Sequence, residues 1–323
     1  MSFFCTYFDH RYAEQGLAMI SSLTRFEKKA VVWVLALTEQ CEALLLKMAL
    51  PAIRVVPLRV LLKKRPALEK VRNRRGVVEF YFTANPVFVR FCLEKIPMNQ
   101  LLTKLDSDLY FYQSPRLIRK REEGHSVVIT PHRFPARLRD RERFGKFNVG
   151  WVSIRNDRAG RACARDWERQ CLDWCHDRPE PGRYADQKYL DAWPSRHQRV
   201  KVLKYPGANL ASWNVGEADL SWDGSKVKVN GEPLVFYHFS GLRRMTDRVF
   251  DPQWSQNDLK PSRILVQRVY RPYLAALQAA RKSIGVTGES AESLRYGETG
   301  KKTSPPGFWK RWRRVLRGDY LRV

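Results

Sequence analysis

The chain has 323 residues, of which 44% are hydrophobic, and its 59 Lys and Arg against 33 Asp and Glu give a net charge of +26. The apolar fraction argues against a disordered chain, and the charge predicts an anionic partner such as nucleic acid, anionic lipid or a phosphorylated small molecule. The six cysteines include no Cys-x-x-Cys pair, which favours reduced thiols in a cytosolic protein. We expect neither a signal peptide nor an apolar run of membrane-spanning length.

Strand-like and helix-like segments alternate through the first third of the chain. The run at 30–37 is apolar throughout, which is typical of a parallel strand buried on both faces. The alternation predicts an α/β fold with a mostly parallel sheet. The predicted strands are 2–8, 30–37, 53–58 and 101–115, and the predicted helices are 12–26, 38–50 and 85–96.

The rest of the chain adds strands first and helices later. We predict strands over 126–130 and 143–156, a helix over 158–175, and β structure in 199–206 and 226–241, where Asn230-Gly231 is a hairpin turn signal. The chain then reads as helical to residue 285.

Two aspartates, Asp106 and Asp108, interrupt the apolar stretch 101–115. Ligands bind where strands end in an α/β sheet, and residues two apart on an extended segment point the same way. Two carboxylates on one face repel unless a cation lies between them. The stretch therefore predicts a divalent cation that would bring a diphosphate with it, and the competing interpretation is a solvated turn.

Three later motifs accompany this pair: "FNVG" at 147–150, "ADQKYL" at 185–190 and "YHFSGLRR" at 237–244. Taken in this order, the motifs resemble those of the retaining glycosyltransferases with the GT-A nucleotide-sugar fold, of the glycogenin and lipopolysaccharide galactosyltransferase type. The resemblance covers roughly residues 1–245. It implies a GT-A catalytic domain over 1–255, followed by a helical extension over 256–285.

The resemblance implies a metal and donor site. Asp106 and Asp108 would bind Mn²⁺ or Mg²⁺, and Asp106 also the donor diphosphate, while His238 would complete the metal shell. The remaining implied donor contacts are Asp9 and Tyr12 in the base-binding loop, Arg90 from the helix before the metal strand, Asn148 near the sugar, and Gly241 and Arg244 near the diphosphate.

The resemblance also implies the reaction. A hexose would pass from a nucleotide-diphosphate sugar to a glycan or glycolipid acceptor with retention at the anomeric carbon. Asp186 and Gln187 would stabilise the positive charge that develops there. No dedicated base is needed, because the leaving phosphate can take the proton of the acceptor.

Other functions stay open on the sequence. The segment "KKRPALEKVRNRR" at 63–75 could contact nucleic-acid phosphates, which makes a basic nucleic-acid-binding protein without catalysis the main alternative; no recognisable nucleic-acid module supports it. A phosphotransferase of the Asp-x-Asp type ranks lower, because Tyr110 stands where that motif has Thr or Val.

Individual residues also have structural interpretations. His238 could be a hydrogen-bonded core histidine, and Asp186 could cap a helix. Cys171, Cys175 and His176 lie at the spacing of a zinc site, but their tryptophan neighbours favour core packing.

The C-terminal residues differ from the rest. Residues 286–307 read as a flexible linker, and 308–323 as a basic, tryptophan-bearing amphipathic tail. Such a tail predicts an enzyme on the cytoplasmic face of an anionic membrane with a lipid-linked acceptor. The other interpretation is a helix docked on the catalytic domain. The oligomeric state is not predicted.

Overall fold

A computed structural model describes residues 1–285 and 320–322, and its centre is a seven-stranded sheet. The strand order is β3-β2-β1-β4-β7-β6-β8, with β7 antiparallel to both neighbours and the other pairs parallel. The prediction of an α/β fold with a mostly parallel sheet is therefore confirmed. The strands of this sheet are β1 (Ser2–Phe8), β2 (Ala30–Ala36), β3 (Ile53–Pro57), β4 (Leu101–Leu105), β6 (Val127–Pro131), β7 (Phe147–Arg155) and β8 (Val200–Val202).

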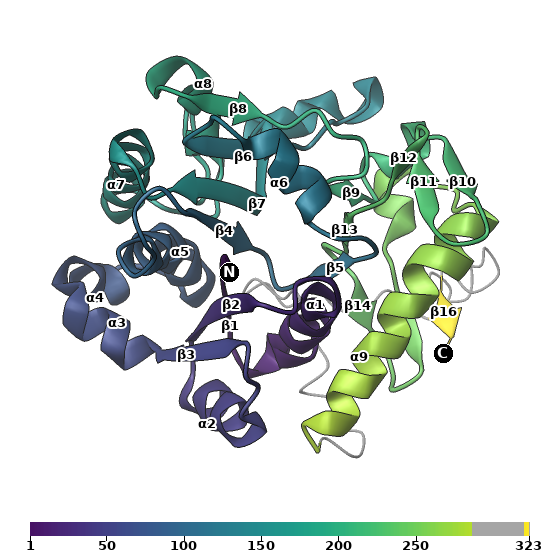
Figure 1. Ribbon diagram of the computed structural model, residues 1–323, viewed down its shortest axis with the longest axis horizontal. Coiled ribbons are helices and arrows are strands. Elements are labelled where there is room, and N and C mark those ends of the chain that lie inside the picture. The colour runs from purple at the N-terminus through teal and green to yellow at the C-terminus, as the bar shows by residue number, and fades with distance from the viewer. Residues whose placement is uncertain (286–319, 323) are drawn as a thin grey trace.

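Helices cover both faces of the central sheet (Figure 1). Because side chains alternate along a strand, Phe3 and Cys5 join the core on the α5 and α7 side, whereas Phe4 and Phe8 join the core on the α1 side. The helices are α1 (Ala13–Phe26), α2 (Glu39–Met48), α3 (Leu58–Lys64), α4 (Pro66–Arg72), α5 (Val77–Leu93), α6 (Arg116–Glu122), α7 (Arg158–Asp173), α8 (Trp193–Arg196) and α9 (Arg271–Ser283).

The stretch 101–115, predicted as one strand, forms two strands in different sheets. β4 belongs to the central sheet, and β5 (Leu109–Phe111) pairs with β13 (Phe236–His238), which in turn pairs with β9 (Leu210–Ala211). The aspartates occupy the turn between β4 and β5. The site residues on this turn are therefore held by two sheets at once.

A third core joins the C-terminal half to the body. The π-helical turn Leu265–Tyr270 leads into α9, which packs against α1 (Figure 1). Leu321 belongs to this core and lies in β16 (Leu321–Arg322), which pairs with β15 (Val249–Asp251) beside β14 (Arg243–Arg244). The division of the chain at residue 255 stays a prediction. A small hairpin sheet completes the fold with β10 (Leu220–Trp222), β11 (Val227–Val229) and β12 (Glu232–Pro233).

Two further findings concern predictions made from composition. All six cysteines are buried free thiols, and Cys171 and Cys175 pack in the core beside α7. His176 instead contacts Glu79, with its Nδ1 3.0 Å from a carboxylate oxygen. Within 1–285 and 320–322, no helix combines the length and the apolar character that crossing a lipid bilayer requires. The predicted linker and most of the predicted tail lie outside the described residues.

Candidate active site

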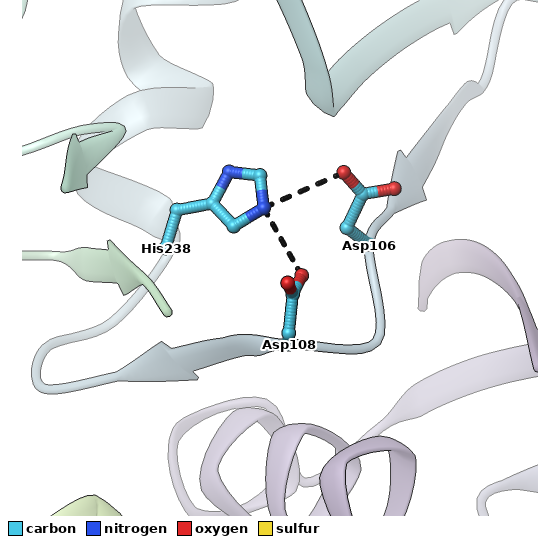
Figure 2. Close-up of side chains that lie close together, drawn as sticks. All are labelled: Asp106, Asp108 and His238. Carbon is cyan, nitrogen blue, oxygen red and sulfur yellow. Dashed lines mark ion pairs between the residues drawn. The ribbon is translucent and has the colours of Figure 1, made fainter. Parts of the chain in front are cut away.

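Two aspartates and a histidine meet in the turn after β4. β13 runs antiparallel to β5, which sets His238 opposite Leu109, and the amide of Phe239 donates a 2.9 Å hydrogen bond to the carbonyl of Asp108. Nε2 of His238 lies 3.0 Å from a carboxylate oxygen of Asp108 and 3.7 Å from one of Asp106 (Figure 2). One ligand atom from each residue lies within 4.8 Å of the others.

The charges of this cluster stabilise one another. Burial would lower the pKa of His238, but the charge of Asp108 and the hydrogen bond to it raise the pKa overall. Burial would raise the pKa of Asp108, and the same histidine lowers it. Two carboxylates and an imidazole with Nε2 aimed at both form a donor set that could hold a divalent cation.

Gly150 in β7 packs closely against the cluster. A Cβ at Gly150 would lie 2.5 Å from Oδ1 of Asn148 and 3.0 Å from Nδ1 of His238. The amide of Gly150 donates to Oδ1 of Asn148 at 2.6 Å, and its carbonyl accepts from the amide of Asp106 at 3.0 Å. The "FNVG" motif therefore sets the close approach of three site residues, which explains why it needs glycine.

Asn148 also contacts a histidine that the sequence analysis did not single out. Nδ2 of Asn148 lies 3.3 Å from Nε2 of His132, whose ring stacks on Phe134 and meets Trp213 edge-on. Burial, reinforced by the charge of His238, lowers the pKa of His132 to about 3. His132 is therefore neutral at physiological pH.

Asp186 is buried beside α5. Its carboxylate accepts a 2.6 Å hydrogen bond from Nδ2 of Asn85 in α5, and its carbonyl accepts one of 2.8 Å from the indole of Trp167. Burial raises the pKa of Asp186 to about 6. Its side chain caps no helix, so the capping interpretation is wrong. Neighbouring Gln187 donates from Nε2 to the carbonyl of Phe144 at 3.0 Å.

A lysine inside β4 joins the same group of charges. The side chain of Lys104 is only 1% exposed, and its ammonium donates to a carboxylate oxygen of Asp106 and, at 3.0 Å, to the carbonyl of Val149. The ammonium also lies 5.4 Å from the centre of the Tyr7 ring. Lys104 and His238 therefore both contact the aspartate pair.

One cavity of about 520 Å³ connects most of these residues. Its wall includes the ends of β1 and β4, between which the order of the sheet reverses, and such switch points are where α/β sheets bind ligands. Asp9 and Tyr12 lie at the β1 end. The Asp9 carboxylate caps the turn that follows and accepts from the guanidinium of Arg11 at 2.7 Å and 2.9 Å. The predicted site residues in the cavity wall are Asp9, Tyr12, Asp106, Asp108, Asn148, Asp186, Gln187 and His238.

Two predicted donor contacts lie elsewhere. Arg90 forms ion pairs with Glu168 and Glu94 and does not line this cavity, so its donor contact stays a prediction. α5 instead presents Asn85, because five residues turn a helix by about 500° and leave the two side chains about 140° apart. Arg244 is buried against Glu14, with its guanidinium 2.5 Å from the carboxylate.

Gly241 and Arg244 line a second, smaller cavity of about 90 Å³ that also touches Asp108. Gly241 has φ of 81°, a left-handed conformation that favours glycine where the chain turns after His238. Because Arg244 already holds a buried carboxylate partner, the structure does not leave its charge open to a diphosphate. The prediction of diphosphate contact by Arg244 is therefore not supported by its surroundings.

Three site residues escaped the sequence analysis: Asn85, Lys104 and His132. Lys104 carried a usable signal, because a lysine within an otherwise apolar central strand must have a partner. His132 follows a predicted strand closely, as site residues often do. Asn85 had no signal, because only the phase of α5 decides which of its side chains faces Asp186.

The comparisons with known proteins agree with this geometry. The chain is 30% identical over 250 residues to the uncharacterized protein YfnF of Bacillus subtilis strain 168, covering 75% of this chain and 82% of YfnF. It is 29% identical over 216 residues to the uncharacterized protein YfnD of the same strain, covering 66% and 69%. No protein-family model matches.

Among solved structures, the fold matches the galactosyltransferase LgtC in complex with donor and acceptor sugar analogues. The TM-score is 0.53 at 11% sequence identity, and the match covers 90% of this chain and 99% of LgtC. At this identity the match concerns the fold, whose central sheet and flanking helices are those described above. The chain thus belongs to the same family as YfnF and has the GT-A fold of the nucleotide-sugar glycosyltransferases.

Proposed function

We propose that the chain is a metal-dependent glycosyltransferase that moves a hexose from a nucleotide-diphosphate sugar to a glycan or glycolipid acceptor, with retention at the anomeric carbon. The observation that carries the proposal is the cluster of Asp106, Asp108 and His238 at the wall of a cavity of about 520 Å³ on a GT-A fold. The volume of this cavity lies in the range of small-ligand sites.

Asp106, Asp108 and His238 would hold Mn²⁺ or Mg²⁺. When bound, the cation would supply a Lewis acid for the charge of the leaving diphosphate. Asp9 and Tyr12 would contact the base at the β1 end of the cavity. Such an arrangement places the nucleotide along the switch point between β1 and β4.

The hexose would lie toward Asn148, Asp186 and Gln187. An ionised Asp186 stabilises positive charge at the anomeric carbon, with Gln187 as a neutral oxygen donor beside it. Since Asp186 has a pKa of about 6, it is mostly ionised at neutral pH. The acceptor proton would pass to the leaving phosphate, so no residue of the chain is assigned as general base.

The test is a thermal-shift screen of nucleoside diphosphates and their sugars, with and without Mn²⁺, followed by a transfer or hydrolysis assay on the donor that binds. A ligand that binds only the folded state raises the apparent melting temperature. We expect stabilisation that needs Mn²⁺ and that is absent from Asp108→Asn. Stabilisation of both proteins by a nucleotide sugar without metal would contradict the metal-dependent mechanism.

We also propose a lipid-linked acceptor and a peripheral position on the cytoplasmic side of an anionic membrane. The support is the sequence of 308–323, with its tryptophans among Lys and Arg. Because Leu321 is part of the core, truncation would remove a strand as well as the basic residues. Replacing Lys310, Arg311, Arg313, Arg314 and Arg317 by glutamine keeps β16, and that variant should lose co-sedimentation with anionic liposomes. Equal partitioning of wild type and this variant onto the liposomes would contradict membrane binding.

A further inference from the structure

Lys104 occupies a place where a lysine is costly. It sits in the middle of the central sheet, opposite Cys5 of β1 and Val152 of β7. Its side chain is 1% exposed, and a buried ammonium is tolerated only when paired and hydrogen-bonded. The bonds to Asp106 and to the carbonyl of Val149 meet that requirement. The partner it uses is a carboxylate that would also bind the metal.

The other cations at the cavity have different partners. Arg11 holds Asp9, and Arg141 donates at 2.6 Å to Oδ1 of Asn257 and to the carbonyl of Gln256. Arg90, expected in the site, is paired outside it. Of the arginines and the lysine named here, Lys104 is the one that contacts the aspartate pair, and the other contact is His238, which would itself be a metal ligand.

Lys104 and a divalent cation need the same carboxylate. With Lys104 bonded to Asp106, the aspartate pair offers a divalent cation a net charge close to −1 in place of −2. Coulomb attraction between a divalent cation and the site falls accordingly, and the loss is larger in a partly buried site than in water. A nucleoside diphosphate would restore the lost negative charge, because it brings its own oxygen ligands.

We propose that Lys104 is a built-in counter-ion that competes with the divalent cation for Asp106, so that the metal binds weakly alone and tightly together with the donor diphosphate. The inference rests on the proposed function and deepens it: metal and nucleotide enter and leave the site as a coupled pair. Such coupling is reciprocal, since each ligand must raise the affinity of the other by the same factor.

Lys104 acts through Asp106 and is a positioning residue. Its removal should therefore tighten binding of Mn²⁺ alone, whereas simple loss of structure would weaken it. For Lys104→Met we expect the dissociation constant of Mn²⁺ to fall by about tenfold or more. The factor by which a nucleoside diphosphate improves Mn²⁺ binding should shrink correspondingly.

The experiment is calorimetric titration of MnCl₂ into metal-free full-length protein, without nucleotide and then with the nucleoside diphosphate found in the thermal-shift screen. Lys104→Gln is the second neutral variant, and Lys228→Met is the matched control, because it removes a lysine that pairs with Asp223 outside the cavity. We expect tighter Mn²⁺ binding in both Lys104 variants and none of this change in Lys228→Met.

If wild type binds Mn²⁺ and the folded Lys104 variants bind Mn²⁺ with unchanged or weaker affinity, the inference is overturned and the metal site stands. Absence of Mn²⁺ binding in wild type and variants, with and without nucleotide, would overturn both proposals. If neither variant folds, wild-type protein with ¹⁵N-labelled lysine decides: one side-chain ammonium resonance should shift with Mg²⁺ and broaden with Mn²⁺. Absence of such a resonance would overturn the inference.

Discussion

Two buried clusters of charge lie close together in this molecule and differ in how completely they are paired. In the first, Asp106, Asp108 and His238 line the cavity, and Lys104 contacts Asp106 from within the sheet. In the second, the carboxylate of Glu14 receives Arg244 at 2.5 Å and Arg281 at 2.9 Å. The second cluster ties α1 to β14 and α9.

The difference separates binding chemistry from structural chemistry better than residue type does. Both clusters pair acids with bases, and both include a residue that the sequence motifs placed in the site. Arg244 stabilises the fold because both oxygens of its partner are taken up by arginines. Asp106 can serve a ligand because its second oxygen lies toward His238 and the cavity. Access and remaining bonding capacity decide the role.

The largest expected effect comes from the first cluster, whose two aspartates line the cavity. Asp108→Asn should lower transfer activity by about 1,000-fold or more, because it removes charge where the metal would bind. The melting temperature of the metal-free protein should change little, since the amide oxygen still accepts from His238. Activity assays with excess Mn²⁺ and a thermal melt measure both; a large loss of stability with normal activity would place this cluster with the structural one.

Asp186→Asn should lower turnover by about 100-fold or more while changing the Michaelis constant for donor little, as expected for a group that acts in the transition state. In wild type, turnover should fall as the pH drops through about 6, because the carboxylate with that pKa becomes protonated. A kcat profile that stays flat from pH 5 to 8 would exclude Asp186 from the reacting centre.

The second cluster, in which Glu14 pairs with two arginines, should lose stability rather than activity when it is changed. Glu14→Gln removes the carboxylate that pairs with buried Arg244 and one of the two that pair with Arg281, so we expect a loss of about 3 kcal/mol in unfolding free energy. Turnover of the folded fraction should stay near wild type. The control is Glu69→Gln, which removes an exposed ion pair of 3.8 Å with Arg72 and should cost less than about 1 kcal/mol. Denaturant unfolding compares the two.

The smallest effect is a gain of stability at Asp186, a buried carboxylate that lines the same cavity as the first cluster. Because the folded pKa of Asp186 lies above its unfolded value, the group favours the folded state at low pH and loses that contribution as the pH rises through about 6. Metal-free Asp186→Asn should therefore be more stable than wild type at pH 7.5 by roughly 2 kcal/mol. Below about pH 4 the difference should vanish, and a variant less stable at pH 7.5 would contradict the assignment.

The two clusters also show what sequence can and cannot predict. Hydrophobic patterning placed Asp106 and Asp108 on an apolar strand, because that signal is local, but it did not predict that 101–115 divides into β4 and β5. Grouping His238 with the aspartates needed motif order, since more than a hundred residues intervene. The pairing of Glu14 with Arg244 spans 230 positions and has no local signal. The contact of Asn85 with Asp186 was not predicted either, because strand-and-helix patterning does not fix the rotational phase of α5.

The final strand has a mechanical consequence. Residues 320–322 are attached to β15, and residue 285 follows α9, so both flanks of the intervening segment are held by the body. Burying Leu321 stabilises this attachment by about 2 kcal/mol before its backbone pairing is counted. A load on β16 would be transmitted through β15 to β14, and from there to Arg244, so traction at this strand reaches the salt-bridge cluster behind the active site.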